Sequence, residues 1–168
     1  MGSGRNVVYS KGESQAYAPT YHVVPSMLKH DKKHPDIYDP ERGYFHNPTA
    51  TKLNDAIQGD TVMFKGRKAE GSFTYVIDTN GNVIFGKRAN PNNPNGRAPH
   101  PTLIGGKHPK VQMAGILHIE RGKIKSFDDQ SGHFRPSSKS MEKMEAAMRK
   151  LYDKNHNLFT DNFTWRNK

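Results

Sequence analysis

Asn80-Gly81 stands between two runs of strand-forming residues, Phe73-Thr74-Tyr75-Val76-Ile77-Asp78 before it and Asn82-Val83-Ile84-Phe85 after it. Asn-Gly is a strong signal for a two-residue hairpin, because both central positions of that turn need a positive φ. A second pair of strand-forming runs, residues 111–120 and 123–127, meets at Arg121-Gly122. The sequence therefore predicts two antiparallel hairpins that form the centre of a sheet.

The residues around these hairpins predict what covers the sheet. Met141, Met144, Met148 and Leu151 recur at helical spacing, and Ser137 or Ser138 can cap the start of that helix. Residues 61–64 fit a further short strand, residues 49–57 a short helix, and the apolar residues of 155–168 a tail that packs back. We predict an α+β domain, an antiparallel meander of four to five strands with a C-terminal helix packed on one face and short N-terminal helical segments.

Three further segments lie outside the predicted sheet. Residues 1–20 are polar and aperiodic, which predicts a mobile N-terminal arm ahead of a single basic domain over 21–168. Histidines and lysines cluster in residues 22–47, and because His30 and His34 lack a carboxylate partner, we expect a solvated basic loop or short helix there. The proline-rich stretch 86–110 is a long loop of the kind that is usually functional or disordered, and its end is apolar enough to dock on the sheet.

The composition indicates the kind of partner. The chain has 26 Lys and Arg against 16 Asp and Glu, a formal net charge of +10, which attracts RNA or DNA and equally suits an acidic protein. It has no cysteine, which excludes disulfides and thiolate metal sites. No apolar run approaches the ~20 residues of a membrane span. We expect a monomer without a membrane span.

Two histidines at the boundaries of the sheet carry the candidate chemistry. His100 ends the proline-rich loop, and His133 follows a strand and a glycine. Two histidines beside a fixed cation can cleave a phosphodiester: one takes the 2′-hydroxyl proton, the other protonates the leaving oxygen, and Arg135 or Lys107 stabilises the charge on phosphorus. Thr102 is the fourth candidate for catalysis. In the competing interpretation the segment around His133 is a structural corner.

We assign substrate binding to residues around this pair, and we predict no metal site. The candidates are Lys107, Ser131, Phe134, Ser137 and Tyr75.

Four motifs keep a fixed order over residues 75–151. They are Tyr75-Val76-Ile77-Asp78 with Gly81-Asn82, His100-Pro101-Thr102-Leu103-Ile104-Gly105-Gly106, Ala114-Gly115 followed by Gly122-Lys123-Ile124, and Ser131-Gly132-His133-Phe134-Arg135-Pro136 before the helix. In this order they resemble a module at the C-termini of bacterial polymorphic toxins of the Rhs and insecticidal types, which also occurs in plant IQ-motif calmodulin-binding proteins. The resemblance implies a toxin domain that is secreted or delivered and acts in the cytoplasm of a target cell.

The chain departs from the pattern of these toxins at two positions. Ile116 stands where the pattern has an acid after Ala-Gly, and Phe134 replaces the usual tyrosine. ADP-ribosyltransferase toxins generally use a catalytic glutamate. The isoleucine at position 116 therefore weakens the interpretation of the chain as such an enzyme, unless Glu120, Asp128 or Asp129 takes the place of that glutamate. Neither departure changes the two histidines of the pattern, His100 and His133.

Three functions therefore compete. We favour a metal-independent ribonuclease toxin that uses two-histidine catalysis and no cofactor, with RNA or a nucleotide as substrate. The alternatives are an ADP-ribosyltransferase that uses NAD to modify a protein or RNA, and a non-enzymatic basic binding module. A toxic effector also implies an immunity protein, and an acidic one would cover the basic surface.

Overall fold

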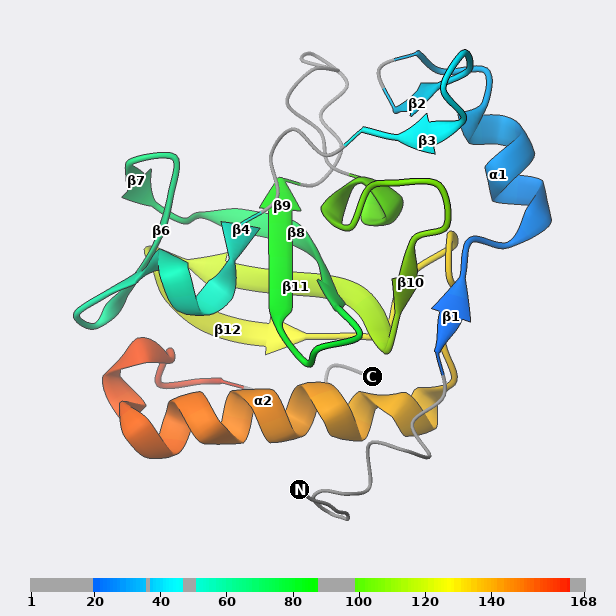
Figure 1. Ribbon diagram of the computed structural model, residues 1–168. Helices are drawn as coiled ribbons and strands as arrows, with labels where there is room; N and C mark the ends of the chain where they lie inside the picture. Colours follow the sequence, from blue (N-terminus) through cyan, green and yellow to red (C-terminus); the bar gives the residue numbers. More distant parts are fainter. Residues whose placement is uncertain (1–19, 36, 47–50, 88–98, 164–168) are drawn as a thin grey trace.

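The computed structural model describes residues 20–35, 37–46, 51–87 and 99–163, and its central element is an antiparallel sheet of five strands (Figure 1). The order across the sheet is β4-β9-β8-β11-β12. The bounds of these strands are Thr51–Lys52 for β4, Gly71–Ile77 for β8, Val83–Lys87 for β9, Met113–Glu120 for β11 and Lys123–Phe127 for β12.

Both predicted hairpins are present. β8 pairs with β9 up to Ile77↔Val83, and β11 pairs with β12 up to Glu120↔Lys123. The order differs from a simple meander in one respect, because β11 pairs with β8 rather than with β9. β8 therefore has a strand on each side, and its residues 73–77 are all buried. A strand that is buried on both faces is expected to have a continuous run of apolar residues, and residues 73–77 fit this pattern apart from Thr74.

The two turns differ from each other. At Arg121-Gly122 both residues have positive φ, 52° and 79°, as a two-residue type I′ turn requires. At the first hairpin only Gly81 does, with φ 89°, so the predicted two-residue turn at Asn80-Gly81 is wrong in type. The carboxylate of Asp78 accepts hydrogen bonds from the backbone N–H groups of Asn80 and Asn82, which stabilises a longer connection.

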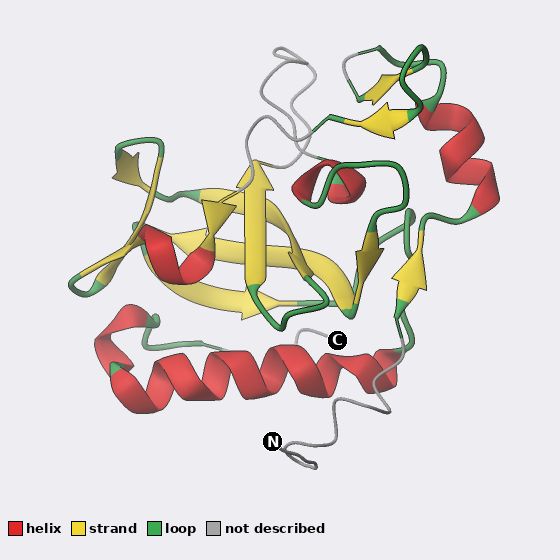
Figure 2. Ribbon diagram, viewed as in Figure 1, coloured by secondary structure: helices red, strands yellow, loops and turns green. Residues whose placement is uncertain are grey.

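The predicted C-terminal helix, α2, spans Met141–Lys154 and covers one face of the sheet (Figure 2). Met141, Met144 and Met148 are buried against Phe73, Tyr75 and other core residues of β8 and β11. Full burial of such a side chain contributes about 1.5–3 kcal/mol. This confirms the α+β class. Within the described residues, no helix is both long and apolar enough to cross a membrane.

A short 3-10 helix, η4 (His100–Leu103), covers part of the opposite face. Leu103 and Phe134 pack with Val76 and Ile84 in a second, smaller cluster. The end of the proline-rich loop thus docks on the sheet as expected, whereas residues 88–98 of that loop lie outside the described residues.

The N-terminal segment packs beside this second cluster. β1 (Tyr21–His22) pairs with β10 (Lys110–Val111), and α1 (Pro25–Asp31) follows it. Two small hairpin sheets complete the strands: β2 (Tyr38–Asp39) with β3 (Tyr44–Phe45), and β5 (Ile57–Gln58) with β6 (Thr61–Phe64) and β7 (Arg67–Lys68). Among these, β6 was predicted from the sequence.

The remaining expectations meet different outcomes. In place of a helix over 49–57 the structure has β4, the 3-10 helix η2 (Leu53–Ala56) and β5. Of the described residues 51–57 only Leu53 and Ala56 are buried. The tail packs back through the 3-10 helix η6 (His156–Leu158) and the buried Phe159. Trp165 and all of the predicted arm except Thr20 lie outside the described residues.

The glycine at position 115 yields a prediction about stability. A Cβ there would collide with the carbonyl oxygen of Asp128 and lie 2.8 Å from Cε2 of Tyr75. We expect Gly115→Ala to lower the free energy of unfolding by about 1–3 kcal/mol or more, because rigid backbone would have to move. Urea denaturation measures this change.

Gly132→Ala is the matched control, since a Cβ at Gly132 meets nothing within 4 Å. Its unfolding free energy should stay within about 0.5 kcal/mol of the wild type. Equal stabilities of the two variants would contradict the close packing at Gly115.

Candidate functional site

The fold brings His100 and His133 together. Their ring centroids lie 6.5 Å apart and the rings are inclined by 55°. His100 begins η4, which is docked on β8 and β9, and His133 lies in the turn that follows β12. The two residues are 33 positions apart in the sequence, so their proximity is a property of the sheet topology.

His100 is fixed by the backbone of the sheet. It is buried, and its Nε2 lies 2.7 Å from the carbonyl oxygen of Gly115 in β11. A carbonyl oxygen only accepts hydrogen bonds, so Nε2 carries a proton and donates it.

His133 is fixed by a carboxylate that the sequence analysis did not assign to the site. Its Nε2 lies 3.0 Å from Oδ2 and 3.3 Å from Oδ1 of Asp31. The side chain of Asp31 is 1% exposed and that of His133 is 14% exposed. A buried carboxylate is costly unless it is paired, so the two groups stabilise each other and the ring is held in one orientation.

Asp31 reaches this position because α1 ends there. Pro25 starts the helix at the position where proline is tolerated, and the N–H of Val24 donates to the carbonyl of His133 at 2.8 Å. This hydrogen bond ties the start of α1 to the turn that carries His133. The expectation of a short helix in the histidine- and lysine-rich segment is confirmed by α1. The expectation that this helix is solvated is wrong for Asp31, the one acid of α1, which is buried.

The turn around His133 is built by residues that we had assigned to the substrate. The hydroxyl of Ser131 accepts the N–H of Phe134, and its carbonyl accepts the N–H of Arg135. Phe134 is 2% exposed because it packs in the second apolar cluster. Phe134 is therefore a core residue, and the hydroxyl of Ser131 is engaged within the turn.

Two further assignments need correction. Tyr75 is completely buried, and its hydroxyl donates to the carbonyl of Asp128 at 2.8 Å. Burial raises the pKa of Tyr75 well above its ordinary value, so it stays protonated as a core residue. Thr102 is also buried, and its hydroxyl donates to the carbonyl of Pro99, which stabilises η4. Neither residue is placed to bind or react with a substrate.

Three of the predicted site residues are exposed at the surface, Arg135, Lys107 and Ser137. Arg135 and Lys107 are exposed, and Arg135 has a φ of 44° immediately after the turn. Ser137 is exposed as well, and its hydroxyl accepts the N–H of Lys139. It therefore caps the 3-10 helix η5 (Ser138–Ser140) ahead of α2.

Two of the acids proposed as substitutes for position 116, Glu120 and Asp128, lie at or beside the ends of β11 and β12. Glu120 is exposed at the end of β11. Oδ1 of Asp128 accepts the N–H groups of Ile116 and Gln130, and its Oδ2 lies 3.6 Å from Nε2 of His118. Asp128 thus holds the backbone at the end of β12. Within the described residues, no three His, Asp or Glu side chains gather as metal ligands do.

The arrangement supports proton transfer. In both rings Nε2 contacts a protein acceptor, the carbonyl of Gly115 for His100 and the carboxylate of Asp31 for His133. A carboxylate on the far side of an imidazole stabilises the imidazolium that forms when the ring accepts a proton. His133 is the more exposed of the two, so it is the ring that a ligand meets first.

A double-mutant cycle tests the pair of Asp31 and His133. We expect Asp31→Asn and His133→Gln to destabilise the protein non-additively, with a coupling of at least about 1 kcal/mol, because each variant leaves the other partner without its counterpart. Unfolding free energies from chemical denaturation give the coupling.

The control cycle combines Asp31→Asn with His156→Gln, an exposed histidine of η6. That cycle should be additive within about 0.5 kcal/mol. Additive behaviour in both cycles would show that Asp31 does not hold His133.

Comparisons with known proteins add nothing to this geometry: no family model matches the chain, and neither the curated proteins nor the solved structures contain a match. The function is therefore argued from the site itself.

Proposed function

We propose that this protein is a ribonuclease that cleaves RNA by acid–base catalysis through His100 and His133. The observation that carries the proposal is the pairing of the two imidazoles 6.5 Å apart, with a buried carboxylate behind one of them. In this proposal a single phosphodiester group contacts both rings. Paired proton donors and acceptors of this kind typically contribute about 100- to 10,000-fold each to a reaction rate.

The roles of the two rings follow from their partners. Nδ1 of His133 takes the proton of the 2′-hydroxyl, and Asp31 stabilises the imidazolium that results. The 2′-oxygen attacks phosphorus, and the bond to the 5′-oxygen breaks as that oxygen receives a proton from Nδ1 of His100. The products are a 2′,3′-cyclic phosphate and a 5′-hydroxyl, with every proton accounted for and no step that passes through a metal or NAD.

The charge of the chain supports a polyanionic substrate. The net charge of +10 raises the local concentration of RNA, and Arg135 follows His133 by two residues on the surface. In this proposal Arg135 or Lys107 stabilises the charge that develops on phosphorus.

The carboxylates favour this reaction over ADP-ribosyl transfer. Position 116 is a buried isoleucine, Glu120 is exposed at a strand end, and Asp128 is engaged by backbone N–H groups. Asp31, whose carboxylate contacts the ring of His133, is engaged by that ring.

We further propose that the ribonuclease acts as the toxic domain of a delivered effector in the cytoplasm of a target cell. The resemblance of the motif order to that of polymorphic toxins supports this role. An acidic immunity protein is the expected partner, because it would neutralise the basic surface and cover the histidine pair.

Incubation with RNA in EDTA tests the proposed reaction. Wild-type protein should cut single-stranded RNA and leave 2′,3′-cyclic phosphate ends, whereas a strand with a 2′-deoxy sugar at the cut position should stay intact there. His133→Gln and His100→Gln should each lower the rate by about 100-fold or more, since each removes one proton transfer.

The matched control is His156→Gln, which should cut at the wild-type rate because His156 is exposed beyond the end of α2. RNA that stays intact at high protein concentration would overturn the proposal. Transfer of label from NAD to lysate, abolished by His133→Gln, would replace it with ADP-ribosylation.

A further inference from the structure

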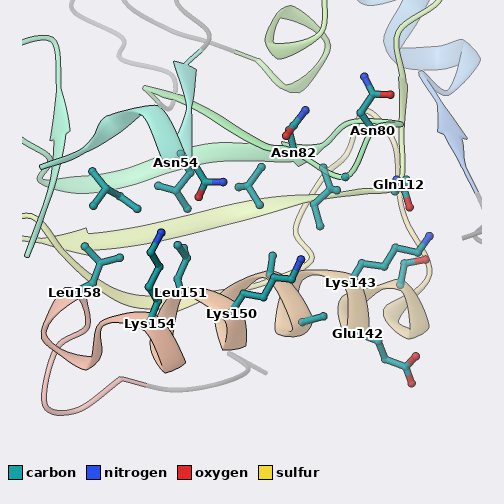
Figure 3. Close-up of a pocket in the computed structure, with 18 of the residues that line it drawn as sticks. Asn54, Asn80, Asn82, Gln112, Glu142, Lys143, Lys150, Leu151, Lys154 and Leu158 are labelled. Carbon is teal, nitrogen blue, oxygen red and sulfur yellow. The ribbon is translucent and has the colours of Figure 1, made fainter. Parts of the chain in front are cut away.

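A large groove lies between α2 and the end of the sheet formed by the β8–β9 hairpin and η2 (Figure 3). Its volume is about 1540 Å³. The histidine pair does not line it, so the groove is not explained by the site already described. It is large enough to hold a segment of a polymer.

One wall of the groove carries a row of lysines. Lys143, Lys150 and Lys154 lie on α2 at spacings of seven and four residues, which places them on one side of the helix, and Lys139 precedes them. Figure 3 shows the ammonium ends of Lys143, Lys150 and Lys154 directed toward the sheet side of the groove. From residue 139 to 154 the row extends about 22 Å at the rise of an α-helix.

Lysines outnumber acids along the groove, which is lined by Lys139, Lys143, Lys150 and Lys154 and by the two acids Asp60 and Glu142. Glu142 points away from the sheet (Figure 3), and Oδ1 of Asp60 accepts a hydrogen bond from the side chain of Asn155 at 2.8 Å. Lys143 is half-buried, and this burial lowers its pKa to about 8.

The opposite wall has the composition of a base-binding surface. It carries the side-chain amides of Asn54, Asn80, Asn82 and Gln112 (Figure 3), and the partly buried apolar residues Ile57 and, on α2, Leu151 also line the groove. Asp78 holds two of these amides in place, since Nδ2 of Asn82 donates to its carboxylate and Nε2 of Gln112 to its carbonyl. Amides offer both donors and acceptors to the edges of bases, and apolar side chains accept their faces.

The groove includes a residue of the segment that follows His133. Ser137, four residues after His133, lines it together with Tyr21. The N–H of Ser137 donates to the hydroxyl of Tyr21 at 3.0 Å, and that hydroxyl lies 2.7 Å from Oγ of Ser140. These contacts connect the groove to the segment of the candidate site.

We propose that this groove binds a single-stranded segment of RNA, with phosphates along the lysine row and bases against the amide wall. The inference rests on the proposed function, for which the groove is the extended binding site of the substrate. Single-stranded RNA fits better than a duplex or an acidic peptide, because its unpaired bases use the amides and apolar floor while its phosphates use the lysines.

Binding of an uncleavable RNA separates this inference from the cleavage reaction. The probe is a fluorescent 12-nucleotide 2′-O-methyl RNA, measured by fluorescence anisotropy at a series of salt concentrations. The triple variant Lys143→Gln, Lys150→Gln and Lys154→Gln should bind at least about 10-fold more weakly at 0.15 M salt, and its logarithmic salt slope should be shallower by about 2.

Two further variants keep the test sharp. Lys150→Gln with Lys154→Gln changes exposed residues only, so it keeps the fold, and it should make the salt slope shallower by about 1.4. The control Lys65→Gln, Lys68→Gln and Lys125→Gln removes the same charge as the triple variant from exposed positions outside the groove, and its affinity should stay within about 3-fold of the wild type.

Each result has one meaning. Equal losses in the triple variant and the control, or wild-type binding by the triple variant, would overturn the groove as an RNA site, even where wild-type protein cuts RNA. If the triple variant loses binding to a fluorescent acidic peptide but keeps its binding to the RNA, the groove is also overturned as an RNA site. If the lysine row is needed for binding but wild-type protein leaves unmodified RNA uncut, the groove is supported and the proposed ribonuclease is overturned.

Discussion

The close approach of three chain segments at Gly115 is the constraint on which the sheet and the candidate site both depend. The backbone of β11 passes Tyr75 of β8 and the carbonyl of Asp128 with no space for a side chain. The hydroxyl of Tyr75 donates to that carbonyl, and the carboxylate of Asp128 accepts the N–H of Ile116. The carbonyl of Gly115 itself accepts a hydrogen bond from Nε2 of His100. The packing of the strands thereby positions one of the two histidines.

The second histidine depends on a different and longer connection. Asp31 and His133 are 102 residues apart, and they meet because α1 is attached to the turn after β12 through the bond from Val24 to His133. A carboxylate buried to this extent needs its partner, so the N-terminal helix and the turn stabilise each other. The candidate site is thus assembled from η4, the turn and α1, on the face of the sheet opposite α2.

The sequence predicted the elements with strong local signals. The strand-forming runs on either side of Asn80-Gly81 and Arg121-Gly122, and the methionine spacing of α2, are local patterns that the structure retains. The turn at Asn80 was mistaken because the carboxylate of Asp78 competes for the backbone N–H groups. The pairing of β11 with β8 was missed because strand order is set by contacts between distant segments.

The candidate site was partly predictable for the same reason. The boundaries of the strands indicated His100 and His133, whereas no local pattern distinguishes Asp31, and the signal near it was only a lone acid in a basic run. Tyr75 and Phe134 were assigned to the substrate by their position in motifs, although such aromatic residues beside strands are more often core residues, as here.

The most direct test of the central claim is nitrogen NMR of the imidazoles during titration with an uncleavable 2′-deoxy dinucleotide. If His100 and His133 form one phosphodiester site, the Nδ1 resonances of both rings shift together along a single binding curve while both Nε2 atoms keep their protons. Saturation with the dinucleotide that leaves both rings unchanged would contradict the account.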